Sequence, residues 1–516
     1  MTHAPEPTLD RPTDSWSDLV TAALLGTDRR PVADLLDQAA LQAVARRAGL
    51  RPGPASPLPA AAPADARPAL PEAARLRLGM LLPPRGGSGS TGAGGYSGSS
   101  SSGGSGSLAN LNELLPQWLA DADRHGYRCP AELVPPLLDA ARVRSELRAD
   151  AVALAGPLGY WLAHRNPDWR YVLRTPLPDE GLPEPDRQLW QEGLFAERVT
   201  HLTRLRRRDP ATALELLRST WSSERAEDRL LFLDALQEGL GAEDEPFLEA
   251  ALSDRAKNVR LTAAELLSTL PGSALARRMA QRALACVVLS GTADGPRLTV
   301  HPPTACDAAM QRDGIAAASP TGRADRAFWL GEIVAATPLD AWTGAYGSPD
   351  ELLALPVSDA WQQDLRDAWA RAAVRQGDAR WARALLALPA EDSIPVGSAA
   401  KLLAVLGPEE RADWTTGFLA GHGLADAFQL LVACTAPWPQ PLGRAVLGAL
   451  AQVAAAGGYP WSHSGVIGVA ERSLPPEAAA ELAALAEGAV PAWSETFTRL
   501  GATLHLRATM LAELQP

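Results

Sequence analysis

The sequence predicts an all-α protein built from antiparallel helix pairs, with one small β-hairpin inserted among them. Apolar residues recur at helical spacing through most of the 516-residue chain after position 108. Two similar helix pairs follow each other between residues 209 and 273, and each begins with an acidic residue and a proline. The helical pattern breaks near residues 285–301, where two apolar runs flank a glycine-containing turn.

Residues 1–50 are expected to form an N-terminal helical segment. A first helix is predicted from about residue 15 to residue 25, and Gly26 follows it at the position of a C-cap. A second short helix is expected over residues 32–48. The apolar residues that would share one face of the first helix are Trp16, Leu19, Val20, Ala23 and Leu24.

Residues 51–107 are predicted to be a linker, Pro-rich at first and then Gly/Ser-rich. Seven of the 21 residues in 51–71 are proline, and no helix can continue through that density. A short helix is expected near residues 72–82. Residues 86–107 contain ten of the 43 glycines and otherwise only Ser, Thr, Ala and one Tyr, so we expect a disordered coil there.

Residues 108–516 are predicted to form the helical array. In the tandem pairs, Pro210 and Pro246 mark the two starts, 36 positions apart. The second pair carries Asp254 at its turn, then Val259-Arg260 and a closing Pro271-Gly272, and this pattern resembles the HEAT repeat. The resemblance implies a HEAT-like α-solenoid, in which an acid at the turn and an arginine on the second helix can form a ladder between neighbours.

The first pair is looser, with Arg229 standing where the second pair has Arg260. An irregular helical bundle is therefore the alternative, since helix pairs of this length occur in any all-α protein. Further along the chain, separate helices are predicted over residues 409–420 and 424–434. The inserted hairpin is expected from Val287-Val288-Leu289 and Leu298-Thr299-Val300, which flank Asp294-Gly295-Pro296.

Charge and cysteine content bound the setting of the protein. The net charge of −12 provides no overall positive field to attract nucleic acid or anionic lipid, so nucleic acid is disfavoured as the main partner. The four cysteines are far apart and include no C-x-x-C pair. The N-terminus lacks the basic start and apolar core of a signal peptide, and we see no membrane span. A cytoplasmic protein is expected.

Motifs of the common catalytic classes are missing from the sequence. The only two lysines, Lys257 and Lys401, do not follow glycine, so no P-loop can form, and no H-E-x-x-H, G-x-S-x-G or zinc-finger spacing occurs. We therefore predict no catalytic residue, no cofactor and no metal site. The best catalytic pair that could be proposed is His301 with Cys306 or Asp307, since a thiol beside a base can be an activated nucleophile. The alternative is a rigid His-Pro-Pro loop and a small buried cysteine.

Arginines and tryptophans are the other candidates for binding. Four arginines in five positions, Arg204, Arg206, Arg207 and Arg208, could contact a phosphate or an acidic partner, and Arg260 is a further candidate. The competing interpretation is a solvated helix face or a ladder with Glu215 or Glu224. The stripe Trp361, Leu365 and Trp369 has helical spacing and is typical of a core, whereas an exposed tryptophan would mark a docking surface.

Several short motifs resemble those of an uncharacterised bacterial domain-of-unknown-function family. They are residues 16–30, Trp190-Gln-Glu-Gly193, Arg206 to Pro210, Asp244 to Pro246, Asp254-Arg255 with Val259-Arg260, and Gln311-Arg-Asp-Gly-Ile315. The resemblance implies a HEAT-like protein encoded near a MoxR-type AAA+ ATPase, a von Willebrand factor A domain protein and a SWIM zinc-finger protein, in systems proposed to act in stress or conflict responses. The family has no known catalytic residue to carry over.

The resulting hypothesis is a non-enzymatic scaffold or adaptor that helps a MoxR-type ATPase and its von Willebrand factor A partner to engage clients. Stacked helix pairs present an extended surface, which is the usual use of such an architecture. Two alternatives from other classes remain open. One is an enzyme that uses His301 and Cys306, and the other is a nucleic-acid-binding array that uses the arginines from Arg204 to Arg208.

Overall fold

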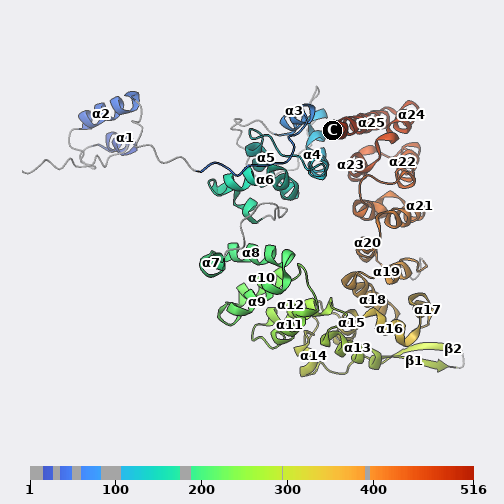
Figure 1. Ribbon diagram of the computed structural model, residues 1–516. Helices are drawn as coiled ribbons and strands as arrows, with labels where there is room; N and C mark the ends of the chain where they lie inside the picture. The colour runs from blue at the N-terminus through green and yellow to red at the C-terminus, as the bar shows by residue number, and fades with distance from the viewer. Residues whose placement is uncertain are drawn as a thin grey trace, which may run out of the picture. The chain divides into compact units, whose positions relative to one another are not determined.

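The computed structural model describes residues 16–26, 35–48, 60–82, 106–174, 187–292, 295–389 and 395–515. The chain divides into two compact units, Met1–Ala62 and Pro63–Pro516. The first unit holds α1 (Trp16–Leu25) and α2 (Leu35–Ala48), which pack against each other (Figure 1). Leu19 and Ala22 are buried, and Gly26 ends α1 with a φ of 84° that favours glycine. The helix predicted over residues 15–25 is thus confirmed.

The second unit is helical apart from one hairpin, so the all-α class with a small β-hairpin is confirmed for the described residues. Before the hairpin come α3 (Glu72–Leu81), α4 (Gly106–Arg124), α5 (Val134–Val143), α6 (Arg148–Ala163), α7 (Arg187–Glu192), α8 (Phe195–Arg208), α9 (Pro210–Thr220), α10 (Ala226–Ala235), α11 (Glu245–Ala251), α12 (Lys257–Ser268) and α13 (Ala274–Cys286). After it come α14 (Ala308–Arg312), α15 (Asp325–Ala335), α16 (Leu339–Tyr346), α17 (Pro349–Ala354), α18 (Gln362–Gln376), α19 (Ala379–Leu386), α20 (Val396–Val405), α21 (Pro408–Ala433), α22 (Gln440–Ala455), α23 (Ser464–Ser473), α24 (Ala479–Gly488) and α25 (Pro491–Ala512).

The hairpin consists of β1 (Val287–Thr292) and β2 (Gly295–Val300), close to the predicted range of 285–301. The strands are antiparallel, with Val287 opposite Val300 and Thr292 opposite Gly295. Its base is anchored in the helices: Leu298 is fully buried, and its N–H donates to Pro356 O over 2.9 Å. Apolar side chains at the base therefore hold the hairpin, whose outer part extends from the helices (Figure 1).

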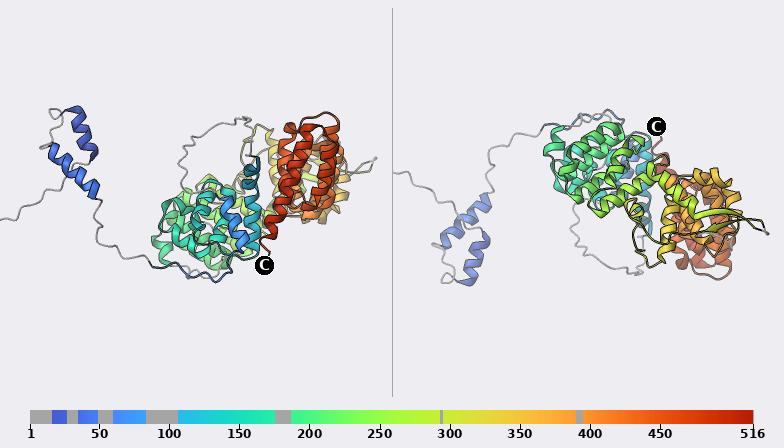
Figure 2. Two further views of the ribbon diagram at one scale, coloured as in Figure 1. Left: turned by 90° about the horizontal axis from the view of Figure 1, so that it is seen from above. Right: turned by 90° about the horizontal axis from the view of Figure 1, so that it is seen from below.

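Helices of the second unit pack mainly on helices close to them in the chain. α8 packs on α9 and α10, α10 and α11 pack on α12, α15 on α18, and α20 on α21. The C-terminal helices, red in Figure 2, lie side by side in the same manner. The buried side chains form three clusters, which are centred on α3–α6, on α7–α20 and on α21–α25. The predicted stripe belongs to the second cluster, because Leu365 and Trp369 are buried and Trp361 packs on them partly exposed.

Residues 63–82, which the sequence assigned to the linker, pack with the helices of the second unit. Leu70, Ala74, Leu78 and Leu81 are buried in the first cluster. The short helix expected near residues 72–82 is α3, and its apolar residues at spacings of three and four face α4. The prolines before it permit an extended approach without preventing this burial. Most of the Gly/Ser-rich stretch, residues 83–105, and the prolines of residues 51–59 lie outside the described residues.

The last helix of the unit packs against its first helices. Met510 and Leu514 are buried in the cluster formed by α3–α6. Tyr127 donates its hydroxyl proton to Leu514 O over 3.1 Å. Arg77 and Glu513 form an ion pair of 2.6 Å with both side chains less than one-fifth exposed. Contacts therefore connect the two ends of the helical array as well as successive helices along it.

Candidate functional site

The arginines predicted to contact partners are mostly bonded inside the protein. Arg206, on α8, has 0 % of its side chain exposed and forms a two-pronged ion pair with Asp244, at 2.7 and 2.8 Å. Its remaining hydrogen bonds go to the backbone carbonyls of Pro210, Leu236, Glu238 and Gly239. Arg206 therefore joins α8 to the end of α10 and the start of α11, and its guanidinium has no surface for a partner.

The other arginines of this group have similar local roles. Arg204 donates to Tyr160 Oη and to Leu173 O, each over 3.2 Å. Arg207 pairs with Glu238 at 2.6 Å, while Arg208 is exposed at the end of α8. Within the group from Arg204 to Arg208, Arg206 therefore pairs with Asp244 and Arg207 with Glu238. Glu224, which the sequence suggested, pairs with Arg198 instead. The cluster does not present four convergent guanidinium groups to an anion.

The candidate Arg260 lies beside a second buried contact between neighbouring helix pairs. Arg260 donates to Asp254 O over 2.8 Å and to Arg255 O over 3.1 Å. Arg229, at the equivalent position of the preceding pair, forms an ion pair with Asp254 at 3.1 Å, and both side chains are less than one-tenth exposed. The acid at this turn therefore links two successive helix pairs.

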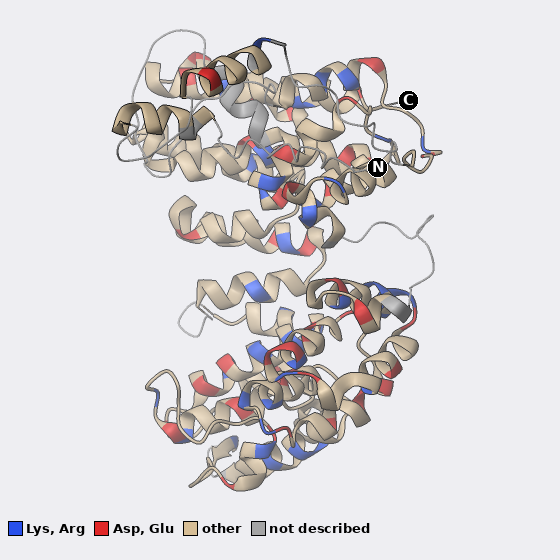
Figure 3. Ribbon diagram, turned by 90° about the vertical axis from the view of Figure 1, so that its left-hand side faces the viewer, with Lys and Arg blue, Asp and Glu red and all other residues tan. Residues whose placement is uncertain are grey.

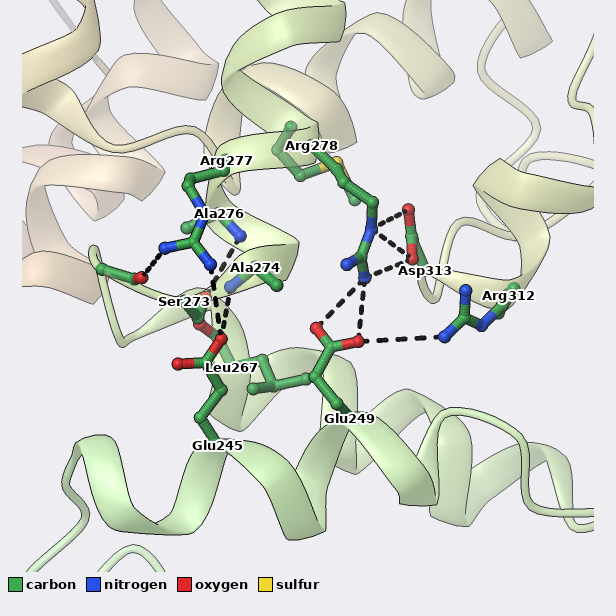
Figure 4. A network of polar contacts seen from close by, with 12 residues as sticks. Glu245, Glu249, Leu267, Ser273, Ala274, Ala276, Arg277, Arg278, Arg312 and Asp313 are labelled. Atoms are coloured by element: carbon green, nitrogen blue, oxygen red, sulfur yellow. Dashed lines mark hydrogen bonds and ion pairs between the residues drawn. The ribbon is translucent and has the colours of Figure 1, made fainter.

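The motif Gln311 to Ile315 fastens α14 to the helices before it (Figure 4). The carboxylate of Asp313 is 2 % exposed and accepts hydrogen bonds from Arg278 over 2.7 Å and from Arg282 over 2.6 Å. Arg278 also pairs with Glu249 of α11 at 3.2 Å. Gly314 has a φ of 93°, and a Cβ there would lie 2.5 Å from Ala264 Cβ. Each of these charged side chains has an ion-pair partner, so the cluster connects α11, α13 and the end of α14 and offers no unpaired group for a ligand.

The proposed catalytic pair shows no sign of activation. His301 is exposed, and its backbone N–H donates to Cys286 O over 2.7 Å. Burial, and secondly the nearby Asp307 carboxylate, raise the pKa of the Cys306 thiol, whereas a nucleophilic thiolate needs a lowered pKa. The Sγ of Cys306 points to Ile315 O, 3.8 Å away. Cys306 is only partly buried, so the expectation of a small buried cysteine holds in part.

An apolar hollow between α19, α20 and α21 is a site that the sequence prediction missed. Its volume is about 450 Å³. One wall is a stack of rings at spacings of four on α21: the centroids of Trp414 and Phe418 lie 5.3 Å apart, and those of Phe418 and His422 lie 4.1 Å apart. The lining consists of Leu385, Leu386, Leu388, Val396, Ala399, Trp414, Gly417, Phe418, His422 and Asp426. The spacing of the three rings is the sequence signal that could have revealed this wall.

The ring stack is held in place, and charges lie at its edge. The indole N–H of Trp414 donates to Leu386 O over 3.0 Å, which fixes the stack against the end of α19. Gly423, with a φ of 82°, interrupts α21 between His422 and Asp426. Among the residues that the structure describes, Asp426 has no hydrogen-bond or ion-pair partner, and its side chain is exposed. The hollow therefore combines an apolar floor, a wall of stacked aromatic rings and a carboxylate at its edge.

A family model described as a family of unknown function, DUF5691, matches residues 18–514. The chain belongs to this family. No curated protein and no solved structure gives a significant match. The resemblance noted in the sequence is thus confirmed at the level of the DUF5691 family. The motif residues Arg206, Asp244, Asp254 and Asp313 have structural roles in this DUF5691 protein, because the side chain of each is less than one-tenth exposed and forms an ion pair between helices.

The described residues include neither a membrane-spanning helix nor a cluster of metal ligands. No helix within the described ranges has the length and apolar character that a membrane crossing requires. No group of three or more His, Cys, Asp or Glu side chains in those ranges is arranged to hold a metal ion.

Positive and negative residues are interspersed along the helices, without separating into a basic and an acidic face in this view (Figure 3).

Proposed function

We propose that this DUF5691 protein is a non-enzymatic scaffold or adaptor, with a HEAT-like α-solenoid as its interaction surface. The observation that carries the proposal is the presence of two buried arginine-to-acid contacts between neighbouring helices: Arg206 of α8 with Asp244 at the start of α11, and Arg229 of α10 with Asp254 at the turn after α11. Such nearest-neighbour links are the basis of repeat architectures, whose extended surfaces serve mainly in protein–protein binding.

The distribution of reactive and charged groups supports binding of proteins over catalysis or nucleic-acid recognition. The pKa of the Cys306 thiol is raised, so the cysteine is a poor nucleophile at neutral pH. Arg204, Arg206 and Arg207 use their hydrogen bonds within the protein, which leaves little of the cluster for phosphate groups. The net charge of −12 also disfavours binding of nucleic acid.

We propose that the partners are a MoxR-type AAA+ ATPase and a von Willebrand factor A domain protein, in the cytoplasm of a bacterium. The support for this assignment is the resemblance of the sequence motifs to the family described in the sequence analysis, which implies these two proteins as neighbours. In this role the helical array would hold a client or the von Willebrand factor A protein near the ATPase, without performing chemistry itself.

Affinity purification of the tagged full-length chain from its native host, with quantitative mass spectrometry, tests the proposal. We expect enrichment of the ATPase or the von Willebrand factor A protein over a tag-only control. Repeated failure to enrich either under mild conditions would refute the assigned partners. The double variant His301→Ala/Cys306→Ala should recover the same partners and retain cellular function. Loss of function with unchanged folding and partner recovery would favour the enzyme alternative.

A further inference from the structure

We infer that the hollow between α19, α20 and α21 is the docking site for a basic segment of a protein partner, which inserts one large apolar side chain against the ring stack. This inference rests on the proposed scaffold function and assigns it a place and a partner chemistry. The hollow, of about 450 Å³, lies within the size range of sites that bind compact apolar groups.

The walls of the hollow match an apolar anchor. Leu385, Leu386 and Ala399 supply a buried floor, and Trp414 and Phe418 present ring surfaces beside it. The hydrogen bond from Trp414 to Leu386 O holds the wall in one orientation before a ligand arrives. A preformed pocket of this kind gains affinity because little ordering is needed on binding, and aromatic or large aliphatic anchors in such pockets dominate interface energetics.

The charge around the hollow selects a cationic flank on the partner. Among the described residues of α20 and α21, the carboxylates of Glu409, Glu410, Asp413 and Asp426 stand against two cations, Lys401 and Arg411, and Glu410 pairs with Arg383 of α19. Arg411 donates to four backbone carbonyls and is directed into the fold. Within the described part of this region, Glu409, Asp413 and Asp426 are exposed and have no ion-pair partner.

The unpaired carboxylates lie on α21, the helix that carries the ring stack. Asp413 stands about one helical turn before the lining residue Gly417 and Glu409 about two turns before it, while Asp426 lines the hollow itself. Lysine or arginine residues beside the anchor would meet these carboxylates. An anionic or neutral segment would gain the apolar contact alone.

The test uses the full-length chain and short fluorescent peptides in an anisotropy titration. One peptide carries a single central Trp flanked by lysines, a second replaces the lysines with glutamates, and a third replaces the Trp with serine. We expect the Lys/Trp peptide to bind about tenfold or more tightly than either relative, and its affinity to fall as salt is added. Failure of the Lys/Trp peptide to bind, or equal binding of all three, would overturn the inference.

A matched pair of glycine substitutions on α21 locates the site. Gly417 lines the hollow and Gly421 does not, and a Cβ at either position would meet no atom within 4 Å. Gly417→Gln should therefore occupy the hollow without disturbing the fold and weaken peptide binding about tenfold, whereas Gly421→Gln should leave binding unchanged. Equal effects of the two substitutions would show that the peptide binds elsewhere.

A second pair of substitutions distinguishes a local contact with Asp426 from attraction to the general negative charge of the protein. Asp426→Lys and Glu487→Lys make the same change in net charge, at the hollow and on α24 respectively. Only Asp426→Lys should weaken the Lys/Trp peptide, and equal losses would overturn the assignment. Light scattering supplies a further check, because a change from oligomer to monomer in Gly417→Gln would identify a second copy as the occupant and refute a separate partner.

The docking site and the scaffold function can fail independently. If the Gly417→Gln chain still recovers the host partners that the wild-type chain recovers, the docking inference is wrong and the scaffold function stands. If the wild-type chain recovers no partner while the peptide results hold at the hollow, the proposed partners are wrong and the binding site stands. Loss of partner recovery in Gly417→Gln, with recovery kept in Gly421→Gln, supports both.

Discussion

Breaking the buried pair between Arg206 and Asp244 should strongly destabilise the contact of α8 with the end of α10 and the start of α11. Both side chains are almost completely buried, and the two nitrogen–oxygen distances are 2.7 and 2.8 Å. Asp244→Asn keeps the shape and an oxygen that can accept from the N–H of Gly241, but it leaves the guanidinium charge without its partner. Removal of one member of such a pair costs about 3–5 kcal/mol.

That cost corresponds to amide hydrogen exchange that is about a hundredfold to several thousandfold faster, at about 1.4 kcal/mol for each factor of ten. Hydrogen–deuterium exchange of peptides from α8 measures it locally, which avoids assuming two-state unfolding of a large helical array. Arg206→Met should have a similar effect, since it leaves the carboxylate buried alone. Arg207→Met is the matched control, because the Arg207–Glu238 pair is about two-fifths exposed and should contribute at most about 1 kcal/mol.

The double variant Arg206→Met/Asp244→Asn distinguishes a coupled pair from two independent contributions. With both charges removed, the cost should not exceed that of the larger single substitution, which gives a coupling energy of about 3 kcal/mol. Exchange in Asp244→Asn no faster than in Arg207→Met, or a double variant that costs the sum of the singles, would refute the interpretation of this pair as a link between repeats.

Three further outcomes are expected. Gly314→Ala should destabilise the protein by more than about 1 kcal/mol, because its positive φ is combined with a steric clash, whereas Gly377→Ala at a similar φ in open space should cost less; equal shifts in thermal midpoint would contradict this. Cys306 should be the first cysteine alkylated by iodoacetamide, and slowly at neutral pH because its pKa is raised; peptide mass spectrometry that finds a buried cysteine modified first would contradict it. Tyr127→Phe should cost about 1 kcal/mol and increase exchange near Leu514, and unchanged exchange there would show that their hydrogen bond contributes little.

The parts of the fold that could be predicted from sequence are those governed by local patterns. Helical spacing and the N-cap acid with proline predicted the start of α9 at Pro210, where Asp209 accepts from the N–H of Thr212. The helices predicted over residues 409–420 and 424–434 are the two parts of α21, which meet at the positive φ of Gly423. The hairpin was predictable because β-branched runs flank a glycine turn.

The parts that could not be predicted depend on contacts between distant residues. Proline density placed residues 51–71 in the predicted linker 51–107, but Leu70 is buried in the cluster formed by α3–α6. The sequence suggested that the arginines at the end of α8 could contact a partner. In the fold, Arg206 points inward to Asp244, which is 38 residues away in the chain. The aromatic spacing on α21 was visible, but α19 and α20 are needed to turn it into a hollow.

The ion pair between Arg77 and Glu513 joins residues 436 positions apart in the chain. Closing so long a loop has a large entropic cost, and contacts of this separation form late in folding. During synthesis, the core around α3–α6 must wait for Met510 and Leu514, which leave the ribosome long after the helices that they cover. Until then the apolar surface that Met510 and Leu514 cover stays open to water.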